Sequence, residues 1–295
     1  MSTLTRIWQR ILAWLNNLTL DPVPTPKPPV DAPVDDDPPV IVVPPAPAPA
    51  AYHATDWWRN AIVRGMNILD PSMPAELRKQ IFDWRRDDTF VPVYLANDGD
   101  GNYGHTSMYK AGVHGGEVDR LRVNWMRDEL QKYRARGQRI DFWLMADDSK
   151  RISKLPETVQ MRYINNAVGA FGDLAAQWCL CLEAQETWPD KGMQKRLIAH
   201  LKTLTNQPAF IHYWSYKDWQ MAVDAGADGF HAQYGFGLTP ATIRAQTLDA
   251  APKVHAAGLR YIAFEYGKDN ESDADKARGR AAMEAGADGT GSGCS

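Results

Sequence analysis

The chain has 295 residues, with 33 Lys and Arg against 36 Asp and Glu, so its net charge at neutral pH is only −3. The sequence has no basic patch of the kind that binds nucleic acids, and no block of like charge indicates an acidic partner tail. No uninterrupted apolar run approaches the roughly 20 residues that cross a bilayer, and the three cysteines do not make a disulfide framework.

Residues 1–20 predict an amphipathic helix. Its apolar side chains recur at spacings of three and four residues, opposite a face of arginine and asparagine. They are Leu4, Ile7, Trp8, Ile11, Leu12, Leu15 and Leu18. A solvated stripe this wide is unfavourable, so we expect the helix to dock to a membrane surface or a partner protein. The alternatives are that it folds back on the remaining chain or stays disordered.

Residues 21–51 are dominated by Pro, Ala, Val and Asp. Such a composition cannot bury a core and favours extended polyproline II, which predicts a semi-rigid linker. The remaining residues, 52–295, have the length of one α/β barrel. The expected organisation is therefore helix, linker and one barrel domain.

Strand-like and helix-like segments alternate from about residue 60. Strands are predicted at 61–69, 90–98, 139–149, 176–187, 208–215, 227–235, 259–267 and 287–293. Helices are predicted at 73–87, 117–137, 155–172, 190–206, 217–226, 239–258 and 272–286. This alternation predicts a (β/α)8 TIM barrel. Gly137, Gly226, Gly258 and Gly286 suit left-handed helix ends. Because no helix is predicted after the last strand, we expect residues 52–60 to cover that sector.

Polar side chains are dense at the predicted carboxyl ends of the strands, where barrels of this class place their chemistry. The candidate site residues are Asn67, Asp147, Asp148, Glu183, Gln185, Glu186, His212, Trp214, His231, Tyr234 and Glu265. Carboxylates from the fourth and seventh strands would face each other across the barrel mouth. Two opposed carboxylates suit glycoside hydrolysis, because one protonates the leaving oxygen while the other attacks or activates water.

Side-chain alternation predicts which of these acids enter the barrel. In the seventh strand, Ala263 and Glu265 share one face and Phe264 takes the other. A small residue suits the crowded lumen, so we expect Ala263 and Glu265 to point inward and Phe264 toward the helices. The same rule places Glu183 inside, and it leaves Glu186 beyond the regular strand, where a bulge could aim it at the site.

Short motifs resemble the cellulase-like hydrolases of the large retaining glycosidase clan. "RGMN" (64–67) resembles the first-strand motif, "EAQE" (183–186) the fourth-strand acid/base segment, "FHAQY" (230–234) the sixth-strand segment, and "FEYG" (264–267) the nucleophile motif. The resemblance implies a retaining mechanism with Glu265 as nucleophile and Glu186 as acid/base, with Glu183 as the alternative. It also implies that Tyr234 hydrogen-bonds Glu265. Gln185 replaces the asparagine that usually touches the sugar 2-hydroxyl.

A polysaccharide substrate follows from this resemblance, with no cofactor and no metal. His212 and His231 could line the site or be core histidines, and Trp214 could stack on a sugar. Glu265 could instead be a structural acid paired with Arg64. Two other functions stay open: a non-catalytic carbohydrate-binding barrel for attachment, and a phosphate- or flavin-binding barrel that uses "GTGSG" (289–293). The compartment is undecided, although a helix–linker–barrel layout suits an extracellular, surface-tethered or virion-associated hydrolase.

Overall fold

The computed structural model describes residues 56–59, 62–63, 66–98, 105–110, 116–145, 150–267 and 273–292. The expected helix at 1–20, the linker at 21–51, Arg64, Asp147 and Asp148 all lie outside the described residues. Among the helices that are described, none is long and apolar enough to cross a membrane.

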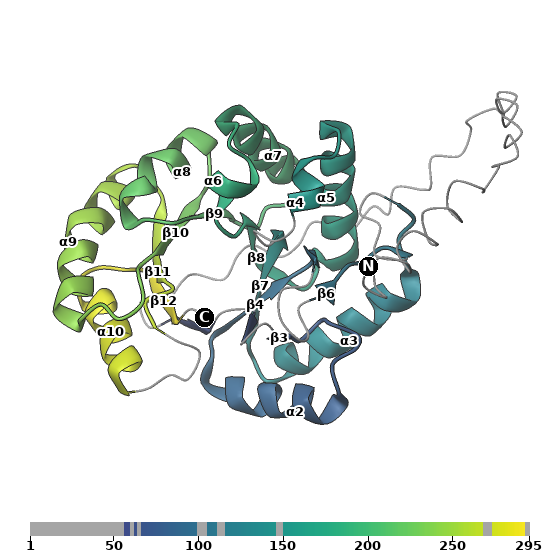
Figure 1. Cartoon of the computed structure of the whole chain (residues 1–295), viewed down its shortest axis with the longest axis horizontal. Helices are drawn as coiled ribbons and strands as arrows, with labels where there is room; N and C mark the ends of the chain where they lie inside the picture. The colour runs from purple at the N-terminus through teal and green to yellow at the C-terminus, as the bar shows by residue number, and fades with distance from the viewer. Residues whose placement is uncertain are drawn as a thin grey trace, which may run out of the picture. The chain divides into compact units, whose positions relative to one another are not determined.

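Parallel strands of the described chain close into a barrel (Figure 1). In order around it they are β1 (Asp56–Arg59), β4 (Phe90–Tyr94), β7 (Arg139–Met145), β8 (Ala175–Cys181), β9 (Ala209–Tyr213), β10 (Gly229–Gln233), β11 (Arg260–Phe264) and β12 (Gly289–Ser292). β12 pairs with β1 from Asp56↔Gly289 onward, and β1 pairs with β4 at Trp58↔Phe90. The α/β barrel class predicted from the alternation is confirmed.

Helices surround the barrel strands (Figure 1). They are α2 (Ala75–Trp84), α3 (Arg120–Ala135), α4 (Lys150–Ser153), α5 (Glu157–Phe171), α6 (Ala184–Thr187), α7 (Lys191–Leu204), α8 (Trp219–Ala225), α9 (Pro240–Ala256) and α10 (Asp273–Glu284), with 3-10 turns η1 (Arg85–Asp87) and η3 (Tyr216–Asp218). Gly137, Gly226, Gly258 and Gly286 have φ of +86°, +74°, +81° and +104°, which confirms the predicted left-handed positions after α3, α8, α9 and α10.

The prediction of the first barrel strand at 61–69 is wrong. That run forms a small antiparallel pair, β2 (Ile62–Val63) with β3 (Met66–Asn67), outside the barrel. The strand that closes the barrel is β1, which lies in the segment expected only to cover the open sector. Closure requires a strand that pairs with both β12 and β4, and the apolar run at 61–69 cannot do so because it pairs with itself.

In two other predicted strands, the polar end forms a separate element. The strand at 90–98 ends at Tyr94, and β5 (Asn97–Asp98) pairs with β6 (His105–Thr106) as a separate antiparallel ladder. The strand at 176–187 ends at Cys181, and residues 184–187 form the short helix α6. In both cases the polar end of the predicted strand leaves the barrel sheet.

The barrel lumen is filled by aromatic rings gathered around Trp143 of β7. Its ring centroid lies 5.6 Å from that of Tyr94, 5.5 Å from His212, 5.1 Å from His231 and 5.4 Å from Phe264. These partners come from β4, β9, β10 and from β11, so one indole links strands around the barrel. The inner cluster comprises Phe90, Tyr94, Trp143, Cys179, Phe210, Ile262 and Phe264.

Asp141 lies two residues before Trp143, on the same face of β7, and is fully buried. Burial raises the pKa of its carboxyl to about 7, while the donation from the Trp143 indole Nε1 to Oδ2 (2.9 Å) opposes that rise. A protonated acid inside the lumen avoids the large desolvation cost of a buried charge.

Asp141→Asn should therefore stabilise the protein at high pH and leave it unchanged near pH 4. Because the pKa of Asp141 is raised in the folded state, the free energy of unfolding is highest below about pH 4. It falls by about 1.4 kcal/mol per pH unit as the pH rises toward 7. Asn keeps the oxygen that accepts from Trp143 and does not ionise. Urea unfolding between pH 4 and pH 8 measures the difference, with Asp249→Asn on the exposed face of α9 as control. Equal pH profiles for Asp141→Asn and the wild type would contradict this account.

Candidate active site

Two glutamates at the carboxyl ends of separate barrel strands have left-handed backbones. Glu183 follows β8, the fourth barrel strand, with φ +45°, and Glu265 follows β11, the seventh, with φ +52°. They are the non-glycine residues with positive φ in the described part of the chain. Such a conformation costs about 1 kcal/mol or more for a residue with a side chain and concentrates at functional sites.

His212 of β9 fixes the backbone of Glu183. The Glu183 N–H donates to His212 Nδ1 at 3.0 Å, so Nδ1 carries no proton and Nε2 carries the hydrogen in the neutral ring. Glu183 then serves as the N-cap residue of α6, which carries Gln185 and Glu186. The predicted bulge that would aim Glu186 is instead a single helical turn. The side chain of Glu186 is half-buried and lies one helical turn after Glu183.

Both lumen histidines are neutral. Burial lowers the pKa of His212 to about 3. Burial, and then the neighbouring His212, lower the pKa of His231 well below its ordinary value. Both rings are fully buried, and they pack against Trp143 and Phe264. They therefore support the floor of the barrel mouth as uncharged rings.

His212→Leu should lower the free energy of unfolding at pH 7 by about 1–3 kcal/mol, because the Glu183 N–H loses its acceptor. His212→Asn, which keeps an acceptor near the position of Nδ1, should lose less. Because the pKa of His212 is lowered in the folded state, the free energy of unfolding is highest above about pH 6.5 and falls as the pH drops toward 3. Both variants should therefore lose less stability than the wild type between pH 7 and pH 5.

Urea unfolding at the two pH values measures both effects. If His212→Leu is as stable as His212→Asn at pH 7, the bond to Glu183 does not hold this segment.

The predicted inward face of β11 is wrong. Phe264 belongs to the inner cluster, whereas Ala263 packs in the outer core between strands and helices. Strict alternation would then place Glu265 on the outer face with Ala263. Its left-handed φ breaks that alternation at the end of the strand. Glu265 is 5% exposed, and its N–H donates to the Gly291 carbonyl at 3.1 Å.

The predicted hydrogen bond between Tyr234 and Glu265 is also wrong. The Tyr234 hydroxyl bonds Thr247 Oγ1 of α9 at 2.7 Å and the Tyr261 hydroxyl at 2.5 Å. Tyr234 shares the outer face of β10 with Phe230 and Ala232, which pack in the outer core. Burial raises its pKa to about 12. Alternation along β10 therefore directs Tyr234 toward the helices.

The side chain of Asn67 forms hydrogen bonds with nearby backbone groups. Its Oδ1 accepts from the Leu69 N–H at 3.0 Å, and its Nδ2 donates to the Tyr94 carbonyl at 3.3 Å. The side chain is fully buried. Asn67 therefore ties β3 to the carboxyl end of β4. The buried amide atoms of Gln185, in contrast, have no hydrogen-bond partner among the described residues.

Trp214 stands at the carboxyl end of β9, as expected, and is 49% exposed. Sequence reasoning missed Phe236, which follows the adjacent strand β10 and is 43% exposed. Its flanking glycines, Gly235 and Gly237, are the signal that could have found it, because they mark a turn tip.

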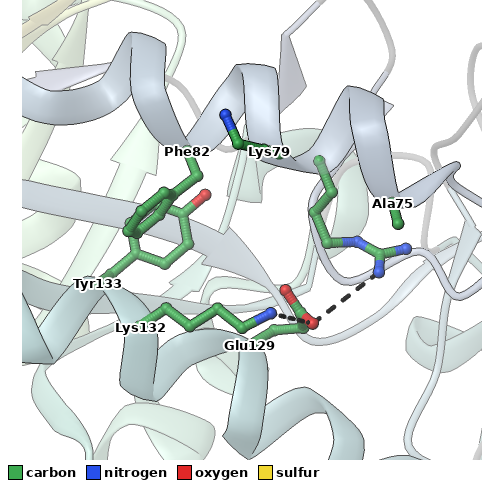
Figure 2. Close-up of a pocket in the computed structure, with 7 residues that line it drawn as sticks. Ala75, Lys79, Phe82, Glu129, Lys132 and Tyr133 are labelled. Atoms are coloured by element: carbon green, nitrogen blue, oxygen red, sulfur yellow. Dashed lines mark hydrogen bonds and ion pairs between the residues drawn. The ribbon is translucent and has the colours of Figure 1, made fainter.

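A surface hollow of about 250 Å³ lies elsewhere, between α2 and α3 on the outside of the barrel. Figure 2 shows Phe82 and Tyr133 on one side of it and Glu129 with Lys132 on the other. Lys132 Nζ contacts Glu129 Oε1 at 2.6 Å, and Lys79 Nζ contacts Asp83 at 2.8 Å, so both lysines have carboxylate partners. This hollow is remote from the strand ends, and the candidate site remains the barrel mouth.

No protein-family model and no curated protein matches the sequence. Solved structures match the fold. A Pseudomonas stutzeri endoglucanase, Cel5A, has a TM-score of 0.60 and 9% identity, over 80% of this chain and 84% of that one. A Bacteroides thetaiotaomicron GH99 endo-α-mannosidase has a TM-score of 0.54 and 13% identity, over 83% and 84%. A presumed glycoside hydrolase from Bacteroides vulgatus has a TM-score of 0.59 and 12% identity, over 80% of this chain but about half, 51%, of that one. At these identities the likeness is one of fold.

Proposed function

We propose that this chain is a glycoside hydrolase that cleaves a polysaccharide by a retaining mechanism with two carboxylates. The observation that carries the proposal is the pair of left-handed glutamates, Glu183 and Glu265, at the ends of the fourth and seventh barrel strands. A strained backbone that the fold maintains at two acids is expected where the orientation of those acids matters. The glycosidases among the fold neighbours support the same class.

In the proposed mechanism, Glu265 attacks the anomeric carbon and forms a covalent glycosyl-enzyme while Glu186 protonates the departing oxygen. Glu186 then takes a proton from water, which attacks the same carbon and releases Glu265. Retention needs the two carboxyl groups about 5–5.5 Å apart. Glu183 is the alternative acid, and its left-handed backbone, held by the bond from its N–H to His212, starts the helical turn that carries Glu186. Gln185 and Trp214 are the proposed contacts to the sugar.

The phosphate- or flavin-binding alternative is less well supported. Within the predicted phosphate-binding segment (289–293), Gly289–Ser292 forms β12, which pairs with β1 on one side and with β11 on the other. Its backbone belongs to the barrel ladder. A non-catalytic carbohydrate-binding barrel would share the fold and bind glycan without turnover, so activity measurements separate it from the proposal.

Glu265→Gln should reduce turnover by more than about 1,000-fold, because the amide cannot form the glycosyl-enzyme. The unfolding midpoint should change little. Reducing-end release is measured first on a panel of glucans, mannans and bacterial glycans to find a substrate, and the variant is then compared on it. Asp249→Asn, on outer helix α9, is the control for a substituted acid away from the mouth. Full activity of Glu265→Gln would disprove the nucleophile assignment.

Glu186→Gln should lose little activity on aryl glycosides with good leaving groups and most of its activity on the natural glycan, since only the latter needs protonation. Glu183→Gln should not show this dependence on the leaving group. Rates on 2,4-dinitrophenyl and unsubstituted phenyl glycosides measure it. If Glu183→Gln shows the dependence and Glu186→Gln does not, the acid/base role belongs to Glu183.

A further inference from the structure

Exposed large apolar side chains separate by type across the described chain. The exposed aliphatic ones, Leu121, Leu204 and Leu248, lie on the outer helices α3, α7 and α9. The exposed aromatic ones are Trp214 and Phe236, here called the aromatic pair. Both follow neighbouring strands, β9 and β10, at the same end of the barrel. Both exposed aromatic rings therefore lie at the end of the barrel that carries Glu183 and Glu265.

The two loops that carry the aromatic pair are joined to each other. Tyr216, two residues after Trp214, stacks on Tyr234, two residues before Phe236, with ring centroids 5.9 Å apart and planes 10° apart. Tyr234 is held in turn by its bonds to Thr247 and to Tyr261. The position of one loop is therefore coupled to that of the other through a buried ring.

Both loops are also held by hydrogen bonds close to the aromatic pair. Ser215 Oγ accepts from the Lys217 N–H at 3.2 Å, which starts η3 directly after Trp214. The Leu238 carbonyl accepts from Arg278 Nε of α10, and Arg278 also pairs with Asp275. The aromatic pair is thus presented on preorganised loops, which reduces the entropy cost of binding a ligand.

We propose that Trp214 and Phe236 form a binding subsite for a glycan chain, and that this subsite holds sugar units beyond those between the carboxylates. The ligand class rests on the proposed function. The C–H faces of pyranose rings are apolar and flat, so they pack on exposed aromatic rings while the sugar hydroxyls stay hydrated. Gln233 Oε1, a buried acceptor at the end of β10 with no hydrogen-bond partner in the described chain, lies between the two loops in sequence and could accept from a sugar hydroxyl.

The test measures binding without turnover. The full chain with Glu265→Gln is run through native gels containing hydroxyethyl cellulose, glucomannan or yeast mannan, and its retardation gives the affinity for each. Adding Trp214→Ala or Phe236→Ala to this parent should weaken binding roughly tenfold. Trp214→Tyr and Phe236→Tyr should restore most of it, because they keep an aromatic face. Leu248→Ala, at a residue also 49% exposed but on outer helix α9, is the matched control and should bind as the parent does.

Retardation that depends on both rings supports the subsite. A parent that none of the three glycans retards, or alanine variants that bind as tightly as the parent, would overturn it. If the wild-type chain cleaves none of the glycans but binding still depends on both rings, the subsite stands and the proposed hydrolysis fails.

Discussion

The packing of Trp143 in the centre of the barrel is the interaction on which the rest of the site depends. One indole touches rings from β4, β9, β10 and β11, so the strands that support the mouth share a single buried partner. Protein interiors are packed as densely as organic crystals, and a displaced ring moves its neighbours. The positions of His212 and His231, and the strand ends above them, follow from this packing.

The same filled lumen determines the charge of the groups inside it. Water is displaced, so the neutral form is favoured for acid and base alike: the pKa of Asp141 rises to about 7 and that of His212 falls to about 3. The raised pKa of Asp141 lowers the stability of the protein at high pH, whereas the lowered pKa of His212 lowers it at low pH. The neutral rings of His212 and His231 therefore add no positive charge below the mouth.

The barrel could be predicted from sequence because strand and helix periodicities alternate over most of the domain, and Gly137, Gly226, Gly258 and Gly286 mark helix ends. The first strand could not, because the run at 61–69 is more apolar than β1, and only pairing with β12 and β4 selects 56–59. Residue size does not predict the inward face of β11, because the lumen accepts the large Phe264 ring against Trp143. A short motif does not predict the direction of Tyr234, because alternation along β10 turns its side chain toward the helices.

The positions of the candidate acids along the chain could be predicted better than their backbone geometry. Glu183 and Glu265 were found as acids at strand ends, but their left-handed backbones depend on contacts distant in sequence, such as His212 Nδ1 for Glu183. Phe236 was missed because an isolated aromatic between glycines has no periodicity. Its relation to Trp214 arises only when β9 and β10 lie side by side.

Trapping of the covalent intermediate tests the central claim most directly. A 2-deoxy-2-fluoro glycoside with a good leaving group, matched to the sugar that the enzyme releases, slows breakdown of a glycosyl-enzyme so that it accumulates. The account predicts that the intact mass of the protein rises by one fluorosugar and that peptide mapping places the sugar on Glu265. No adduct on an enzyme that cleaves the natural glycan, or an adduct on another residue, would contradict it.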